Sequence, residues 1–150
     1  MKLIIISDAH QNEDAIKKII NIYKDRVDVF LCAGDSCLPS YSIFPFISIK
    51  GNCDYFPYDE LLTIHTPIGK LLMRHYPFYN HEIEKYKSLD YKIFIYGHTH
   101  KKEAKRKNDI YIFNPGSISY PRDNSKPSYL FIEINDDNKT LNYEFKFIDE

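Results

Sequence analysis

Apolar residues in the first third of the chain gather into three short runs that predict buried strands. The runs cover residues 2–7, 27–33 and 46–50 and are rich in β-branched or aromatic side chains. Between the first two runs, apolar positions recur with helical spacing at Ala15, Ile16, Ile19, Ile20 and Tyr23. Asn12 precedes this pattern as the expected helix N-cap. Residues 36–45 contain two prolines and are predicted to form a loop.

The rest of the chain consists mostly of paired strand patterns. Segments on either side of turn sequences predict three hairpins, formed by 61–65 with 70–75, 102–107 with 110–113, and 128–134 with 140–148. A short helix is expected over about 80–88, and another strand over 91–96. A βαβ start followed by hairpins predicts an α/β fold in which two sheets pack face to face with helices outside.

Length and charge narrow the class of protein. The 150 residues suit one domain, and we expect residues 1–150 to form it. The 20 basic and 21 acidic side chains leave a formal net charge of −1, which argues against a surface that coats nucleic acid. No apolar run approaches the roughly 20 residues of a membrane helix, and the run 3–6 is too short for a secretory signal. A cytoplasmic location is therefore expected.

The three cysteines do not suggest a structural framework. They lie at positions 32, 37 and 53, an odd number in a chain without a secretory signal, so disulfide bonds are not expected. No CxxC spacing is present, which also argues against a zinc site made of thiolates. Cys32 falls inside an apolar run and is expected to be a core thiol.

Residues of the types that bind metal ions follow five of the predicted strands. They are Asp8, His10, Asp35, Asn52, His75, His98 and His100. Ligands of α/β sheets gather at the carboxyl ends of strands, so these side chains are expected to meet. The i, i+2 spacing of Asp8 and His10, and of His98 and His100, would place each pair on one side of an extended segment.

This mixed set of imidazole, carboxylate and amide donors suits borderline divalent cations. Seven donors are too many for one tetrahedral site but fit two metals that share a bridging carboxylate, for which Asp35 is our choice. Mn²⁺ is the metal we expect, and Fe²⁺, Ni²⁺ and Zn²⁺ suit the same donors.

These residues carry a family resemblance. The motifs Asp8-Ala9-His10, Gly34-Asp35, Gly51-Asn52-Cys53-Asp54, His75 and Gly97-His98-Thr99-His100 occur in the order of the calcineurin-like metallophosphoesterase signature. The Asn-Cys-Asp form, and Asn114-Pro115-Gly116-Ser117, resemble the small YfcE-type phosphodiesterase subgroup, which is itself similar to the retromer subunit Vps29. The resemblance spans residues 1 to about 135.

The resemblance implies a four-layer α/β/β/α sandwich of two mixed sheets flanked by helices, and an enzyme that hydrolyses phosphoesters. Asp8, His10, Asp35 and His100 would hold one metal, and Asp35, Asn52, His75 and His98 the other. A hydroxide bridging the two metals would attack phosphorus, with Asn52, Cys53 and Asp54 as the catalytic set. Residues 114–117 are expected to form a turn that supports the site, with Ser117 as a candidate contact to the substrate phosphate.

The chain departs from the family pattern at three places. Cys53 stands where much of the superfamily has a histidine proposed to protonate the leaving group. The segment 74–77 reads Arg-His-Tyr-Pro where the subgroup often has His-Gly-His. The loop after Asp35 is short where relatives often place a helix.

The expected partner is a small phosphoester, without a membrane or a stable nucleic-acid complex, and the sequence leaves open whether the chain forms a homo-oligomer. Two other functions remain as alternatives: a weakly catalytic binding scaffold like Vps29, and a nuclease. The basic run at 101–107 either attracts an anionic substrate or protects an edge strand, and we favour the edge strand. His65 and His81 are expected to lie outside the site.

Overall fold

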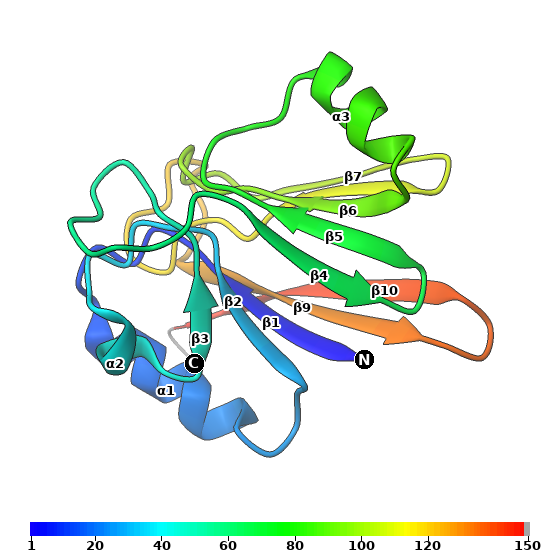
Figure 1. The fold of residues 1–150 in the computed structure, drawn as a ribbon. Helices are drawn as coiled ribbons and strands as arrows, with labels where there is room; N and C mark the ends of the chain where they lie inside the picture. Colours follow the sequence, from blue (N-terminus) through cyan, green and yellow to red (C-terminus); the bar gives the residue numbers. More distant parts are fainter. Residues whose placement is uncertain (149–150) are drawn as a thin grey trace.

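Ten strands form two five-stranded sheets that face each other in the computed structural model, which describes residues 1–148 (Figure 1). The first sheet has the order β10 (Thr140–Phe147), β9 (Ser128–Asn135), β1 (Lys2–Ile6), β2 (Val29–Cys32) and β3 (Phe46–Ser48). The second has the order β4 (Leu62–Thr66), β5 (Gly69–Met73), β6 (Tyr91–Ile95), β8 (Ile110–Asn114) and β7 (Glu103–Lys107).

Both sheets are mixed. Strands β1, β2 and β3 are parallel, β9 pairs antiparallel with β1, and β10 pairs antiparallel with β9. In the second sheet β5, β6 and β8 are parallel, while β4 and β7 pair antiparallel at the two edges. The carboxyl ends of the central strands of each sheet therefore point toward a single edge of that sheet.

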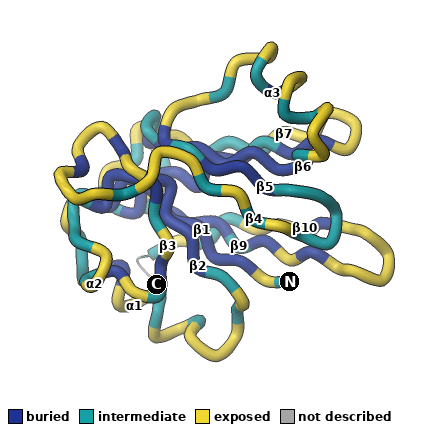
Figure 2. Tube along the Cα trace, in the orientation of Figure 1, coloured by how far each residue is buried: buried dark blue, intermediate teal, exposed yellow. Residues whose placement is uncertain are grey.

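The apolar runs supply the core because alternate residues of a strand face opposite sides of the sheet. In β1, Leu3 and Ile5 belong to the core between the sheets, whereas Ile4 and Ile6 pack on the outer, helix-covered side. The central strands are consequently buried along most of their length, whereas exposed residues lie in the loops, on the helices and along the edge strands β7 and β10 (Figure 2).

Helices cover the outer faces and complete four layers (Figure 1). Helix α1 (Glu13–Tyr23) packs Ile16 and Ile19 against the first sheet, and its N-cap Asn12 accepts a 3.2 Å hydrogen bond from the Ala15 N–H. Helix α3 (Asn80–Lys87) packs Ile83 against the second sheet. The four-layer α/β architecture expected from the sequence is confirmed.

The structure corrects the prediction for residues 36–45. This segment contains a one-turn helix, α2 (Ser40–Ile43), where a loop was expected. Ile43 is fully buried beside α1 and the first sheet, and this packing stabilises a turn that the two flanking prolines obscure in the sequence. Among the described residues, no helix is long and apolar enough to cross a membrane.

Candidate metal centre

Loops from both sheets meet at the carboxyl ends of the strands, where the His98 N–H of the second sheet donates to Asp8 Oδ2 of the first over 3.0 Å, and backbone hydrogen bonds tie the loops within each sheet. The Asp8 N–H donates to the Gly34 carbonyl over 3.0 Å, and the His10 N–H donates to the Asp35 carbonyl over 2.9 Å. The Gly97 N–H likewise donates to the His75 carbonyl over 2.9 Å. The side chains that follow the strands are therefore brought together as the sequence predicted.

The backbone at the predicted ligands is left-handed, which corrects the extended geometry expected for the i, i+2 pairs. Positive φ angles occur at Asp8 (54°), His10 (46°), Asp35 (57°), His98 (68°) and His100 (60°). Such conformations are strained for side chains larger than glycine and tend to cluster at functional sites. The turns send His98 and His100 into different halves of the cluster.

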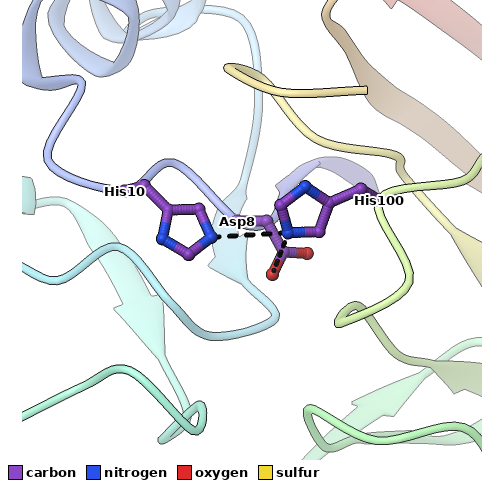
Figure 3. A group of neighbouring side chains, drawn as sticks. All are labelled: Asp8, His10 and His100. Carbon is purple, nitrogen blue, oxygen red and sulfur yellow. Dashed lines mark hydrogen bonds and ion pairs between the residues drawn. The ribbon is translucent and has the colours of Figure 1, made fainter. Parts of the chain in front are cut away.

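One half of the cluster contains Asp8, His10 and His100 (Figure 3). The Nε2 atoms of the two histidines are 3.4 Å apart, and His100 Nε2 lies 3.5 Å from Asp8 Oδ1. The other ring nitrogen of His100, Nδ1, lies 2.7 Å from the carbonyl of Tyr120. When the imidazole is neutral, its Nδ1–H donates a hydrogen bond to that carbonyl, which leaves the Nε2 lone pair facing the cluster.

The other half contains Asp35, His75, Asn52 and His98. His75 Nε2 lies 3.3 Å from Asp35 Oδ2 and 2.9 Å from Asn52 Oδ1. Asn52 Oδ1 is also 3.2 Å from His98 Nδ1. His75 Nδ1 lies 2.7 Å from the Ala33 carbonyl, so the backbone orients this imidazole in the same way as His100.

The two carboxylates connect the halves. Three groups of residues each have ligand atoms within 4.8 Å of one another. The groups are Asp8–His10–His100, Asp8–Asp35–His75 and His10–Asp35–Cys53. Asp8 and Asp35 each belong to two of these groups. The cluster thus has the shared carboxylates that a pair of neighbouring cations requires.

Charges in the cluster are coupled. The Asp8 carboxylate, whose Oδ1 lies 3.5 Å from Nε2, raises the pKa of His100, and burial opposes this only in part. Burial also works to lower the pKa of His75, but the hydrogen bond to Asp35 and the Ala33 carbonyl outweigh it and the pKa is raised. For Asp35, burial would raise the pKa, yet contacts with His75 and the Cys53 N–H lower it.

One further observation, on Asp8, indicates that these donors suit a bound cation. Asp8 is fully buried, and its Oδ1 is a buried oxygen that accepts no hydrogen bond from the residues that the structure describes. Its Oδ2 accepts bonds from Ser7 Oγ over 2.7 Å and from the His98 N–H over 3.0 Å. A buried carboxylate oxygen left unpaired is unfavourable in a protein interior unless a proton or a metal ion satisfies it.

Asp54 has a positioning role in place of the catalytic role that was expected. Its Oδ2 accepts the N–H groups of Asp35 over 2.9 Å and Gly51 over 2.7 Å, and its Oδ1 accepts that of Cys37 over 2.9 Å. Both oxygens are occupied and the residue is buried. Asp54 therefore holds the loop that carries Asp35.

Ser117 likewise supports the site from behind, which corrects its expected contact with phosphate. It is fully buried, and its hydroxyl donates to the Asp8 carbonyl over 2.8 Å while accepting the N–H groups of Ser119 and Tyr120. Cys53, in contrast, is exposed at the cluster, and its N–H donates to Asp35 Oδ1 over 2.8 Å.

Several contributors could not be recognised from residue types. The carbonyls of Ala33 and Tyr120 orient two histidines, and backbone atoms leave no signal in a sequence. The Tyr120 ring lies 6.0 Å from that of His10, and the Tyr76 ring lies 4.8 Å from that of His98. The unusual Arg-His-Tyr-Pro segment drew attention to the position of Tyr76, and no sequence pattern pointed to Tyr120.

The remaining candidates lie outside the cluster. The basic run includes the edge strand β7, where Lys105 pairs with Glu103, and Lys102 pairs with Asp123. These contacts favour the edge-strand interpretation. His65 is exposed on the edge strand β4, and His81 stacks on Tyr79.

Comparisons with known proteins agree with this geometry. A family model described as the calcineurin-like phosphoesterase superfamily domain matches residues 1–137. The chain is 28% identical to the probable metallophosphoesterase YsnB of Bacillus subtilis, with 95% of this chain and 90% of YsnB covered. It is also 28% identical to phosphodiesterase YfcE of Escherichia coli K12, with 86% and 85% covered.

A solved structure from Streptococcus pneumoniae, described as a conserved uncharacterized protein and predicted phosphoesterase, superimposes with a TM-score of 0.85. The two chains are 27% identical, with 99% of this chain and 90% of that one covered. The family match spans most of the chain, and the chain therefore belongs to the calcineurin-like phosphoesterase superfamily.

Proposed function

We propose that this member of the calcineurin-like phosphoesterase superfamily is a dinuclear metal-dependent phosphodiesterase. The observation that carries the proposal is the pair of donor groups joined by Asp8 and Asp35, with a buried Asp8 Oδ1 that accepts no hydrogen bond from the described residues. The name of the relative YfcE supports a diester as the substrate.

The residues that would hold the two cations follow the two halves of the cluster. Asp8, His10, Asp35 and His100 form one donor set; Asp35, Asn52, His75 and His98 form the other. Divalent cations such as Mn²⁺, when bound, would supply Lewis acidity toward a phosphoryl oxygen and lower the pKa of water. Asp35 would serve both cations.

The chain's own groups prepare the site for this chemistry. The Ala33 and Tyr120 carbonyls hold His75 and His100 with Nε2 directed into the cluster. Asn52 is exposed, its Oδ1 lies near both His75 and His98, and its Nδ2 donates to Cys53 Sγ over 3.5 Å, so its second N–H remains able to donate to a phosphoryl oxygen.

The leaving group lacks the usual proton donor. Position 53 carries a thiol, and burial together with the nearby Asp35 raises its pKa. A thiol has a higher ordinary pKa than an imidazole, so near neutral pH it is a poorer proton donor to a departing alkoxide than the histidine of the family pattern. The site should therefore favour diesters whose leaving group needs no protonation, such as aryl diesters.

Metal analysis combined with a substrate panel tests the proposal. We expect two divalent cations per chain and faster hydrolysis of an activated aryl diester than of an alkyl monoester. His98→Ala should abolish turnover, while His65→Ala, an exposed histidine outside the cluster, serves as the matched control.

Two outcomes would replace the proposal by its alternatives. Metal binding without hydrolysis under any of Mn²⁺, Fe²⁺, Ni²⁺ or Zn²⁺ would indicate a binding scaffold. Preferential cleavage of DNA or RNA in the same panel would indicate a nuclease. A cytoplasmic location and a small-molecule substrate remain predictions.

A further inference from the structure

An open pocket adjoins the candidate metal centre on the side of Asn52 and His75. Its volume is about 870 Å³, within the range of small-molecule sites. Beyond these two residues, the pocket is lined by the segment 74–79 and by residues near Leu61. The segment begins with the Arg-His-Tyr-Pro sequence in which this chain departs from the family pattern.

The wall of the pocket is braced by Arg74. Its guanidinium donates two hydrogen bonds to the Glu82 carboxylate, of 2.5 and 2.6 Å, and others to the carbonyls of Tyr76 and Pro77. It also lies 4.2 Å from the centre of the Phe78 ring. The cation is thereby neutralised within the wall, and the backbone that presents Tyr76 is held in place.

The accessible surface of this wall is aromatic. Tyr76 is half exposed and stands beside His75 and His98, with ring centres 5.3 and 4.8 Å away. Tyr79 is 70% exposed, and its ring stacks on that of His81. The other charged side chains on the lining, Lys50 and Glu60, have opposite signs, so the pocket offers no net charge to its occupant.

We infer that this pocket receives one ester group of the phosphodiester and prefers an uncharged planar ring to a small alkyl group. The inference rests on the proposed function, because the metal centre next to the pocket would bind the phosphoryl group. Aromatic side chains bind flat rings through stacking and edge contacts, whereas a methyl group gains little from such a wall.

Binding of non-hydrolysable phosphonates tests the inference without any turnover. Calorimetry on the Mn²⁺-loaded protein would compare phenylphosphonate with methylphosphonate, which carry the same charged group. We expect phenylphosphonate to bind about tenfold more tightly. Tyr79→Ala should reduce this preference to below about threefold while affinity for methylphosphonate stays within about twofold. Tyr41→Ala is the matched control, because Tyr41 is an exposed tyrosine on α2 outside the pocket.

Thymidine 5′-phosphate, as a third ligand, separates two sources of the ring. Binding at least as tight as that of phenylphosphonate supports a nucleobase, and weaker binding supports a simple aryl group. The inference is overturned if wild-type protein binds the two phosphonates equally or not at all, or if Tyr79→Ala keeps the full preference. If the protein hydrolyses diesters but binds the two phosphonates equally, only the inference about the pocket is refuted. If it prefers phenylphosphonate but hydrolyses no diester, only the proposed function is refuted.

Discussion

The Arg74–Glu82 pair offers a prediction whose size can be worked out from the structure. Glu82 accepts both guanidinium hydrogen bonds, and its Oε1 also accepts the Tyr79 N–H over 2.9 Å. The bonds to Arg74, against a smaller opposing effect of burial, lower the pKa of Glu82 from 4.5 to about 2. Glu82→Gln removes the charge but keeps the shape of the side chain.

The shift of 4.5 to about 2 corresponds to an upper limit of about 3.4 kcal/mol. Water screens the pair, because the Arg74 and Glu82 side chains are 20% and 23% exposed. We therefore expect Glu82→Gln to lower the free energy of unfolding by about 1–2 kcal/mol at pH 7. For a chain of this size, the melting temperature should fall by about 2–8 °C.

The pH dependence has a definite sign. Because folding lowers the pKa of Glu82, its contribution is complete above the ordinary value of 4.5 and is lost as the pH falls through about 2. Urea unfolding at a series of pH values should therefore show the two proteins converging in acid. Glu84→Gln, at an exposed position of the same helix, should leave stability unchanged.

A double-mutant cycle with Arg74→Met separates the pair from other effects of each substitution. We expect a coupling free energy of about 1 kcal/mol at pH 7. The reasoning would be refuted if the coupling were absent, or if Glu82→Gln destabilised the protein equally at pH 7 and pH 2.5.

Four further substitutions probe the site. Asp35→Asn should weaken metal binding at both positions by at least about tenfold because one carboxylate serves both cations, while Asp8→Asn should weaken binding mainly at one position. Calorimetric titration measures these affinities, with circular dichroism as the control for folding. The reverse pattern would contradict the assignment of Asp35 as the bridge. Cys53→His should speed hydrolysis of a diester with a poor leaving group by about 10²-fold and that of an activated diester far less, since it restores a proton donor. Equal gains in the steady-state rates of both diesters would disprove the role of a missing proton donor. Gly51→Ala places a methyl group 2.0 Å from Asp35 Oδ1 and 2.6 Å from the Asp35 N. Urea unfolding should therefore show a free energy of unfolding lower by about 1–3 kcal/mol, and calorimetry should show weaker metal binding. Unchanged values of both would show that the loop adapts to the methyl group.

Local patterns were sufficient for most of the fold. Runs such as 2–7 and 27–33 are apolar because central parallel strands are covered on both faces, and this requirement is visible in the sequence without knowledge of their neighbours. The helix α2 was missed, since a single turn has almost no periodicity and depends on the burial of Ile43.

The candidate ligands could also be named from the sequence, because metal-binding residue types follow strand after strand, and parallel strands bring their carboxyl ends to one edge. The resemblance implied a division of these residues between two metals, and the tertiary structure supplies the geometry that a sequence pattern does not contain. The left-handed turns at His98 and His100 separate two side chains that an extended segment would have kept together. Asp54 and Ser117 have the same residue types as catalytic groups, yet their burial and backbone partners make them supports.

The sequence alone thus determined the fold class and the set of donor residues, since both depend on patterns within short stretches of chain. The tertiary structure decided which oxygen is left without a partner, which carbonyls orient the imidazoles, and where the aromatic pocket lies. Each of these features depends on atoms that are distant along the chain, such as His75 and Ala33, and their separation is set by the packing of the two sheets against each other.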